Sequence, residues 1–245
     1  MPAQFFDHRG KMRETWASGA LELLQHADSH IILDTAFDQR IAFISVDNAV
    51  ETALRTFAAL PAKLSGSKIT RAEIEDAGQS FPKLVELVFK HAGERLVGLD
   101  GNDIEHYHRI RNKLYHDGTG LGVDQRYLLA YRKIAEVLLG NLFSVSIKPE
   151  VKSSELGDLI LLWNEVETTL RAKMLAAGVN LGNTFKWEEA MRAGLLDMKT
   201  IEKLTELRMI RNAQVHSQGS ELDVKRIALG IALGREILNQ LNASS

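Results

Sequence analysis

Apolar residues recur at spacings of three and four along most of the chain, which is the pattern of helices that bury one face. Proline, which interrupts helices, occurs only four times. No segment alternates convincingly between apolar and polar residues next to hairpin turns, so we expect no strands. The sequence therefore predicts an all-α protein, with helices at about 15–28, 36–60, 81–98, 102–116, 124–143, 154–178, 184–194, 198–216 and 221–242.

The helical pattern is interrupted near the middle of the chain, between residues 145 and 154. This segment contains Pro149, several polar residues and serines that can cap a following helix. We therefore expect two domains, an N-terminal one at 1–147 with an extra first helix and a C-terminal one at 148–245.

Two short strings occur twice, which indicates an internal duplication. Residues 50–55 read V-E-T-A-L-R and residues 166–171 read V-E-T-T-L-R, while residues 111–116 read R-N-K-L-Y-H and residues 211–216 read R-N-A-Q-V-H. The two strings lie farther apart in the first copy, and we place the extra residues in the polar stretch 64–80.

Each copy then consists of a long helix with the first string, a variable middle, a helix that ends in the second string and a final helix. Four such helices pack as an antiparallel bundle. Asp124 and Asp223 are expected to cap the final helices, and Gly118 and Gly219 to end the helices before them. The glycine-rich run 118–122 follows a helix and lacks a Gly-Lys-Ser/Thr sequence, so we interpret it as a loop rather than a phosphate cradle.

Composition narrows the classes of function. The net charge of -2 provides no overall basic field for nucleic acid, so any RNA binding must be local. The absence of cysteine excludes disulfides, thiolate metal sites and cysteine nucleophiles, and it fits a reducing compartment. No apolar run is long enough for a membrane span or, at the N-terminus, for a signal peptide, so we expect a cytoplasmic protein without a membrane partner.

The repeated R-N-x-x-x-H string carries groups suited to RNA phosphate chemistry. Arginine is permanently charged and can hold a phosphate by two hydrogen bonds, and histidine transfers protons near neutral pH. RNA supplies its own nucleophile, the 2′-hydroxyl, so cleavage needs only acid–base help and anion stabilisation. Two copies supply two histidines, one to deprotonate the 2′-hydroxyl and one to protonate the leaving oxygen.

A structural interpretation of the same string stays open. The Arg and Asn at the end of a helix can cap carbonyls or pair with a buried carboxylate such as Glu51 or Glu167, and the His can simply end the helix. Glu51 and Glu167 each also precede an Arg by four residues, which is the spacing of a surface ion pair. In the functional alternative, each Glu orients the motif Arg from the facing helix.

Both copies resemble the signature of the HEPN superfamily. That signature is an Arg, a polar residue directly after it and a His, near the end of the third main helix of a four-helix bundle. The resemblance implies an all-helical fold of two tandem HEPN domains arranged as a pseudo-dimer. It also implies metal-independent endoribonuclease activity without a cofactor. Proteins of this superfamily occur in toxin–antitoxin, abortive-infection and CRISPR-associated systems, which implies a toxin or anti-phage defence role.

Carried over by residue, the resemblance implies a catalytic site made of Arg111, His116, Arg211 and His216. Asn112, Asn212, Glu51 and Glu167 are expected to support it. The implied partners are an RNA substrate, an antitoxin or regulatory protein and, if the motifs pair between chains, a second copy of the protein. Some members of the superfamily bind nucleotides, RNA or proteins without turnover, which is the alternative function.

The first copy is more basic around its motif than the second. We expect Arg109, Lys113 and Tyr107 to contact the RNA backbone there. His106, His108 and His116 could suggest a metal site, but helix positions two apart point in different directions and no carboxylate lies at ligand spacing with them. We therefore expect no metal site and interpret this helix as a basic face exposed to solvent.

Overall fold

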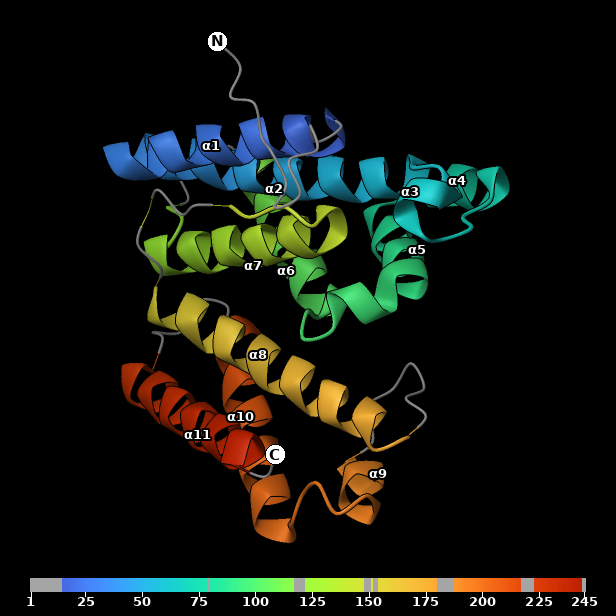
Figure 1. The fold of residues 1–245 in the computed structure, drawn as a ribbon. Helices are drawn as coiled ribbons and strands as arrows, with labels where there is room; N and C mark the ends of the chain where they lie inside the picture. Colours follow the sequence, from blue (N-terminus) through green and yellow to red (C-terminus); the bar gives the residue numbers. More distant parts are fainter. Residues whose placement is uncertain are drawn as a thin grey trace. The chain divides into compact units, whose positions relative to one another are not determined.

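The computed structural model describes residues 15–78, 80–116, 122–147, 151, 154–179, 187–216 and 223–243. All regular secondary structure in these residues is helical, which confirms the all-α class (Figure 1). The chain forms two compact units, one of Met1–Leu96 with Ile104–Lys152 and one of Val97–Asp103 with Ser153–Ser245. The two domains expected at 1–147 and 148–245 stay a prediction.

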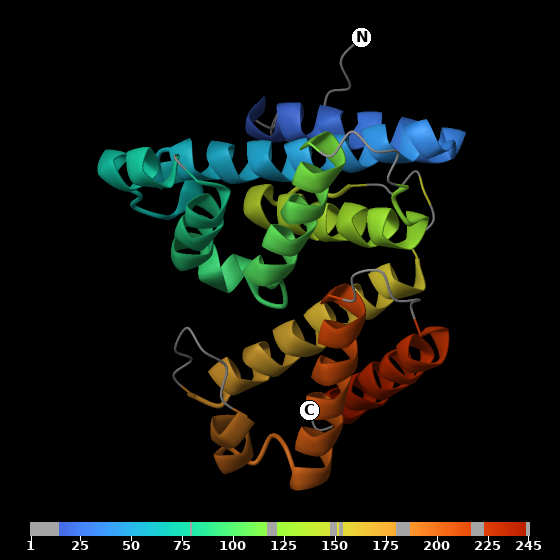
Figure 2. The same ribbon diagram turned by 180° about the vertical axis from the view of Figure 1, so that it is seen from behind.

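The first unit is built around one long buried helix, α2. Its α-helices are α1 (Ser18–Leu33), α2 (Ala36–Ala59), α3 (Ala62–Ser65), α4 (Arg71–Ala77), α5 (Phe81–Ala92), α6 (Gly101–His116, from Ile104 onward) and α7 (Gln125–Phe143). Helix α2 packs against α1, α5 and α7. Its Phe43, Leu54 and Phe57 are fully buried, as are Tyr107 of α6 and Tyr131 of α7. Figure 2 shows α6 in green beside α2 and α7 of the same unit.

Local signals explain where several helices of the first unit begin. The hydroxyl of Thr35 accepts a hydrogen bond from the Asp38 backbone N–H at 3.1 Å and thereby caps α2. Thr70 and Glu73 form a capping box at the start of α4. Hydrogen bonds from the Thr70 backbone and side chain lower the pKa of Glu73 to about 2. The polar stretch 64–80, in which we placed the extra residues of the first copy, contains α4 and the last two residues of α3.

The second unit contains α8 (Glu155–Ala176), α9 (Trp187–Arg192), α10 (Met198–His216) and α11 (Val224–Ala243). Helix α11 packs on both α8 and α10, and α10 also contacts α8. Glycine permits this close approach, because a Cβ atom at Gly234 would lie 2.5 Å from Cδ2 of Leu162 and one at Gly230 would lie 2.9 Å from Cδ1 of Leu159. The order of the long helices therefore repeats, with α8, α10 and α11 following the order of α2, α6 and α7.

Most predicted helices match the structure, with differences at their ends. The first helix continues to Leu33 rather than residue 28, and the helix expected at 81–98 ends at Ala92 and is followed by a 3₁₀ helix at Gly93–Leu96. A glycine after Ala92 and polar residues beyond it explain the early end.

The expected caps are confirmed where the structure describes them. Asp124 accepts a hydrogen bond from the Arg126 backbone N–H at 2.9 Å, Asp223 accepts one from the Arg226 backbone N–H at 3.1 Å, and Ser154 caps α8. The expected helix stops at Gly118 and Gly219 and most of the glycine-rich run lie outside the described residues. Among the described helices, none is long and apolar enough to cross a membrane.

Candidate functional site

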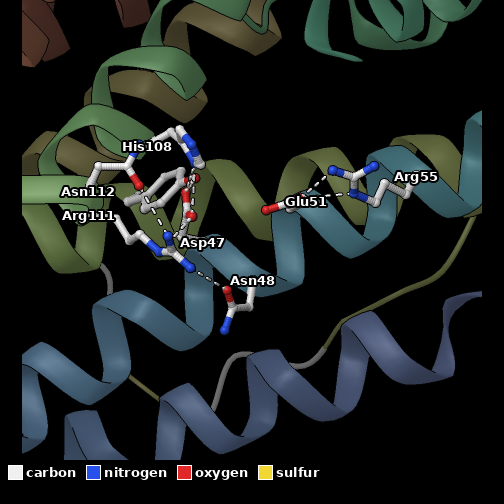
Figure 3. Close-up of polar contacts among 8 residues, drawn as sticks. Asp47, Asn48, Glu51, Arg55, His108, Arg111 and Asn112 are labelled. Carbon is white, nitrogen blue, oxygen red and sulfur yellow. Dashed lines mark hydrogen bonds and ion pairs between the residues drawn. The ribbon is translucent and has the colours of Figure 1, made fainter. Parts of the chain in front are cut away.

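Helices α2 and α6 bring the first motif arginine to a buried carboxylate (Figure 3). Nε of Arg111 lies 3.4 Å from Oδ2 of Asp47, whose side chain is fully buried. The terminal nitrogens of Arg111 donate to Oδ1 of Asn48 at 3.3 Å and to Oδ1 of Asn112 at 3.1 Å. The Asn that follows the Arg in the motif therefore helps to fix the guanidinium.

Asp47 collects further donors from two other positions. The Tyr131 hydroxyl donates to Oδ1 of Asp47 at 2.7 Å, and Nδ1 of His108 lies 3.0 Å from Oδ2. Burial, together with the adjacent Asp47 carboxylate, raises the pKa of Tyr131 well above its usual value, so the phenol remains a donor. The His108 ring stacks on Phe81 at 3.7 Å between centroids. The stacking of His108 on Phe81 and the contacts of His108 and Tyr131 with Asp47 fix the Asp47 carboxylate. That carboxylate in turn fixes Arg111.

Arg111 nevertheless reaches the surface. Its side chain is 21% exposed, and its guanidinium carbon lies 5.3 Å from the centre of the Tyr115 ring. Tyr115 is 65% exposed. The first motif thus presents a fixed cation beside an accessible aromatic ring.

The second motif arginine has a different environment. Arg211 is 2% exposed and forms an ion pair with Asp103, which is 1% exposed and belongs to the same compact unit. It also donates to Oδ1 of Asn212 at 3.1 Å, as Arg111 does to Asn112. Nε2 of His216 lies 3.1 Å from Oδ1 of Asp103, and the His216 side chain is 37% exposed. The burial of Arg211 favours a structural role for this arginine.

The two copies differ in the source of the carboxylate. When residues 50–55 are aligned with residues 166–171, Asp47 corresponds to Trp163 and Asn48 to Asn164. Asn164 donates to the backbone carbonyl of Val97 at 2.7 Å, and the carboxylate for the second arginine comes from Asp103. The helix that supplies the acid in the first copy therefore lacks it in the second.

Glu51, expected to orient the motif arginine, pairs with Arg55 at 2.7 Å, and Figure 3 shows this pair apart from the group around Asp47. The carboxylate that lies beside Arg111 is Asp47, one helical turn earlier, and the supporting role of Glu51 stays a prediction. Glu167 lies 3.7 Å from Arg171. Burial raises the pKa of Glu167, and nearby Arg171, Arg208 and Arg211 oppose that increase.

We expected α6 to be a basic face exposed to solvent, and this is wrong for the side of the helix that carries His106 and Tyr107. Tyr107 is fully buried and stacks on Tyr131 with 4.6 Å between ring centroids, so its ring is not presented to RNA. His106 is also buried. Arg109 and Lys113 are exposed, with Arg109 3.7 Å from a carboxylate oxygen of Glu105. His116 is the last residue of α6, and its side chain lies outside the described residues.

Sequence reasoning missed Asp47, His108, Tyr131 and Asp103 as members of these clusters. One available signal was the longer repeat, because Asn48 and Asn164 extend the V-E-T match by two positions and direct attention to α2. Another was the polar pair at 47 and 48, which lies between the apolar positions 46, 49 and 50 of the same helix. A buried carboxylate requires charged or hydrogen-bonding partners, so Asp47 could have been paired with a motif arginine.

Each unit offers its own chemistry: the first unit holds a fixed cation with two amides, and the second unit holds an imidazole beside a carboxylate. Within the described ranges, no group of three or more His, Asp or Glu residues could hold a metal ion. Arg111 can bind an anion, and His216 lies beside a carboxylate that can orient its ring. No family model, curated protein or solved structure matches this chain.

Proposed function

We propose that the protein is a metal-independent endoribonuclease that cleaves RNA through attack of the 2′-hydroxyl on the adjacent phosphate. The proposal includes tandem HEPN-type domains that act as a pseudo-dimer, and a role as a toxin or an anti-phage defence effector. The observation that carries it is the state of Arg111, which is fixed by Asp47, Asn48 and Asn112 and remains partly exposed.

Arg111 is assigned to the scissile phosphate. A guanidinium has five N–H donors, and the hydrogen bonds to Asn48 and Asn112 engage one on each terminal nitrogen. Each terminal nitrogen has a second N–H, and this pair suits a phosphate held by two bonds. Because the group is held in place before RNA arrives, it stabilises the developing negative charge without reorganising.

The two motif histidines are assigned to proton transfer. One takes the proton of the 2′-hydroxyl and the other gives a proton to the leaving 5′-oxygen, which yields a 2′,3′-cyclic phosphate and a 5′-hydroxyl. His216 stands beside Asp103, a carboxylate that can select its ring orientation. The motifs that cooperate are either His116 and His216 of one chain or like motifs of two chains.

The test is cleavage of a fluorescent single-stranded RNA in the presence of EDTA, with the chemistry of the product ends determined. The wild type should cut and leave 2′,3′-cyclic phosphates, and His116→Ala and His216→Ala should lose at least about 100-fold in rate. His26→Ala is the matched control, because it removes an imidazole from α1, outside both motifs. Absence of cutting by the wild type, or full activity of both motif variants, contradicts the proposal.

One observation favours a second candidate function, binding of a nucleotide, RNA or protein without turnover. Arg211 is buried against Asp103, so the second motif lacks an accessible arginine for a phosphate. In this alternative both motifs serve packing, and the first also binds a ligand. RNA binding that depends on Arg111, without any cleavage in EDTA or in magnesium, would support it.

A further inference from the structure

We propose that Tyr115 is a stacking platform for an unpaired base next to the phosphate held by Arg111, so that the site selects single-stranded over duplex RNA. This inference rests on the proposed function, because it assumes that the anion at Arg111 is an RNA phosphate. It assigns a substrate contact to a residue inside the first motif that is neither the Arg, the Asn nor the His.

The geometry of the Tyr115 ring carries the inference. The residue is 65% exposed although it is a large aromatic side chain on a helix whose other tyrosine, Tyr107, is fully buried. The guanidinium carbon of Arg111 lies 5.3 Å from the ring centre, within the range of a cation–π contact. The ring therefore has a defined neighbour while most of its surface remains accessible.

The second copy of the motif supports a functional reason for this exposure. Val215 occupies the position of Tyr115 and is fully buried, and Arg211 is buried as well. The two copies therefore differ in the exposure of both positions. Arg111 and Tyr115 are accessible in the first copy, whereas Arg211 and Val215 are buried in the second. A residue that only packed the helix end would be expected to be buried in both copies.

The charge of the protein explains why stacking is needed. With a net charge of -2, the chain has little general attraction for a polyanion. Base–aromatic stacking adds affinity without requiring positive charge, and it tolerates any base because every base has a π face. A base within a duplex is already stacked on both faces, so only an unpaired base can use the Tyr115 ring.

The test measures binding and cleavage separately in wild type, Tyr115→Ala and Tyr115→Phe. The binding probe is a fluorescein-labelled 2′-O-methyl oligonucleotide, which lacks the nucleophile and cannot be cleaved, used as a single strand and as a duplex with its complement. Phe37→Ala is the matched control, since Phe37 is a 60% exposed aromatic residue at the start of α2, outside the motif.

We expect the wild type to bind the single strand more tightly than the duplex. Tyr115→Ala should weaken single-strand binding by about 5-fold to about 150-fold, the range that loss of one stacked base produces. Tyr115→Phe and Phe37→Ala should bind like the wild type. Equal affinity of Tyr115→Ala and wild type, or equal affinity of the wild type for both probes, overturns the inference.

Failure of this inference is distinguishable from failure of the proposed function. If the wild type cleaves RNA and Tyr115→Ala cleaves and binds equally well, the stacking role is overturned and the ribonuclease stands. If Tyr115→Ala loses single-strand binding while the wild type cleaves no RNA, the stacking role is supported and the ribonuclease is overturned.

Discussion

The ion pair between Arg211 and Asp103 provides the sharpest test of the asymmetry between the two motifs. Both side chains are almost completely buried. Asp103→Asn keeps the size of the side chain but removes the carboxylate that forms the ion pair with the buried arginine. Removing one partner of a buried pair typically costs about 3–5 kcal/mol, because the remaining charge is uncompensated.

The exposed ion pair between Asp76 and Lys83 gives the matched comparison. The side chains are 67% and 47% exposed, so Asp76→Asn should cost between about 0 and about 1 kcal/mol. The two substitutions are chemically identical and differ in burial. The predicted difference between them is therefore at least about 2 kcal/mol.

Urea unfolding followed by tryptophan fluorescence measures this difference. Trp163 and Trp187 belong to the second unit, and Trp16 is the remaining tryptophan of the chain. A Trp16→Phe background makes the signal report the unit that contains the Arg211–Asp103 pair, and a Trp163→Phe/Trp187→Phe background, which keeps Trp16, makes it report the unit that contains Asp76. An Asp103→Asn variant that is no less stable than Asp76→Asn would refute the assignment of Arg211 to a structural role.

Three further predictions concern other parts of the structure. Burial raises the pKa of Glu167 above its ordinary value of 4.5, so the unfolded chain loses this proton first and stability falls as pH rises from about 4.5 to the higher pKa of the folded state. Glu167→Gln should therefore be more stable than wild type in urea unfolding at neutral pH and equal to it below pH about 4. Gly234→Ala should lower the stability of the second unit by about 1–3 kcal/mol, because the added methyl group overpacks the helix contact. Gly19→Ala is the control and should not destabilise the protein, because the nearest atom to its added Cβ would be 4.0 Å away. Thermal unfolding measures both changes. Asp47→Asn should slow RNA cleavage at least about tenfold at saturating RNA, because Arg111 loses its orienting charge, and an unchanged kcat would contradict this.

The sequence predicted the helices well because apolar spacing depends on each helix alone. The regular apolar stripes of α2 and α8 required no knowledge of their partners. Helix ends were less accurate where no strong stop existed, as at Leu33, where the apolar residues Ile32 and Leu33 continue the helix while remaining exposed. The sequence also indicated the duplication and the motif arginines.

The environment of each arginine could not be predicted in the same way. Asp47 and Arg111 are 64 positions apart, and Asp103 and Arg211 are 108 apart, so their pairing depends on how helices pack. The basic residues around Tyr107 suggested an exposed helix, but Ile104 and Tyr107 lie one turn apart on its buried side. Identical motif letters thus have different burial, because the surrounding helices differ.

The rate of RNA cleavage by Arg111→Lys tests the central claim most directly. Lysine keeps the positive charge but cannot bind a phosphate while also bonding Asn48 and Asn112 in the same plane. In EDTA the wild type should cleave a single-stranded RNA, Arg111→Lys should be slower by about 100-fold or more, and Arg71→Lys, at a 93% exposed arginine, should equal the wild type. No cleavage by the wild type, or wild-type rates in Arg111→Lys, would contradict the account.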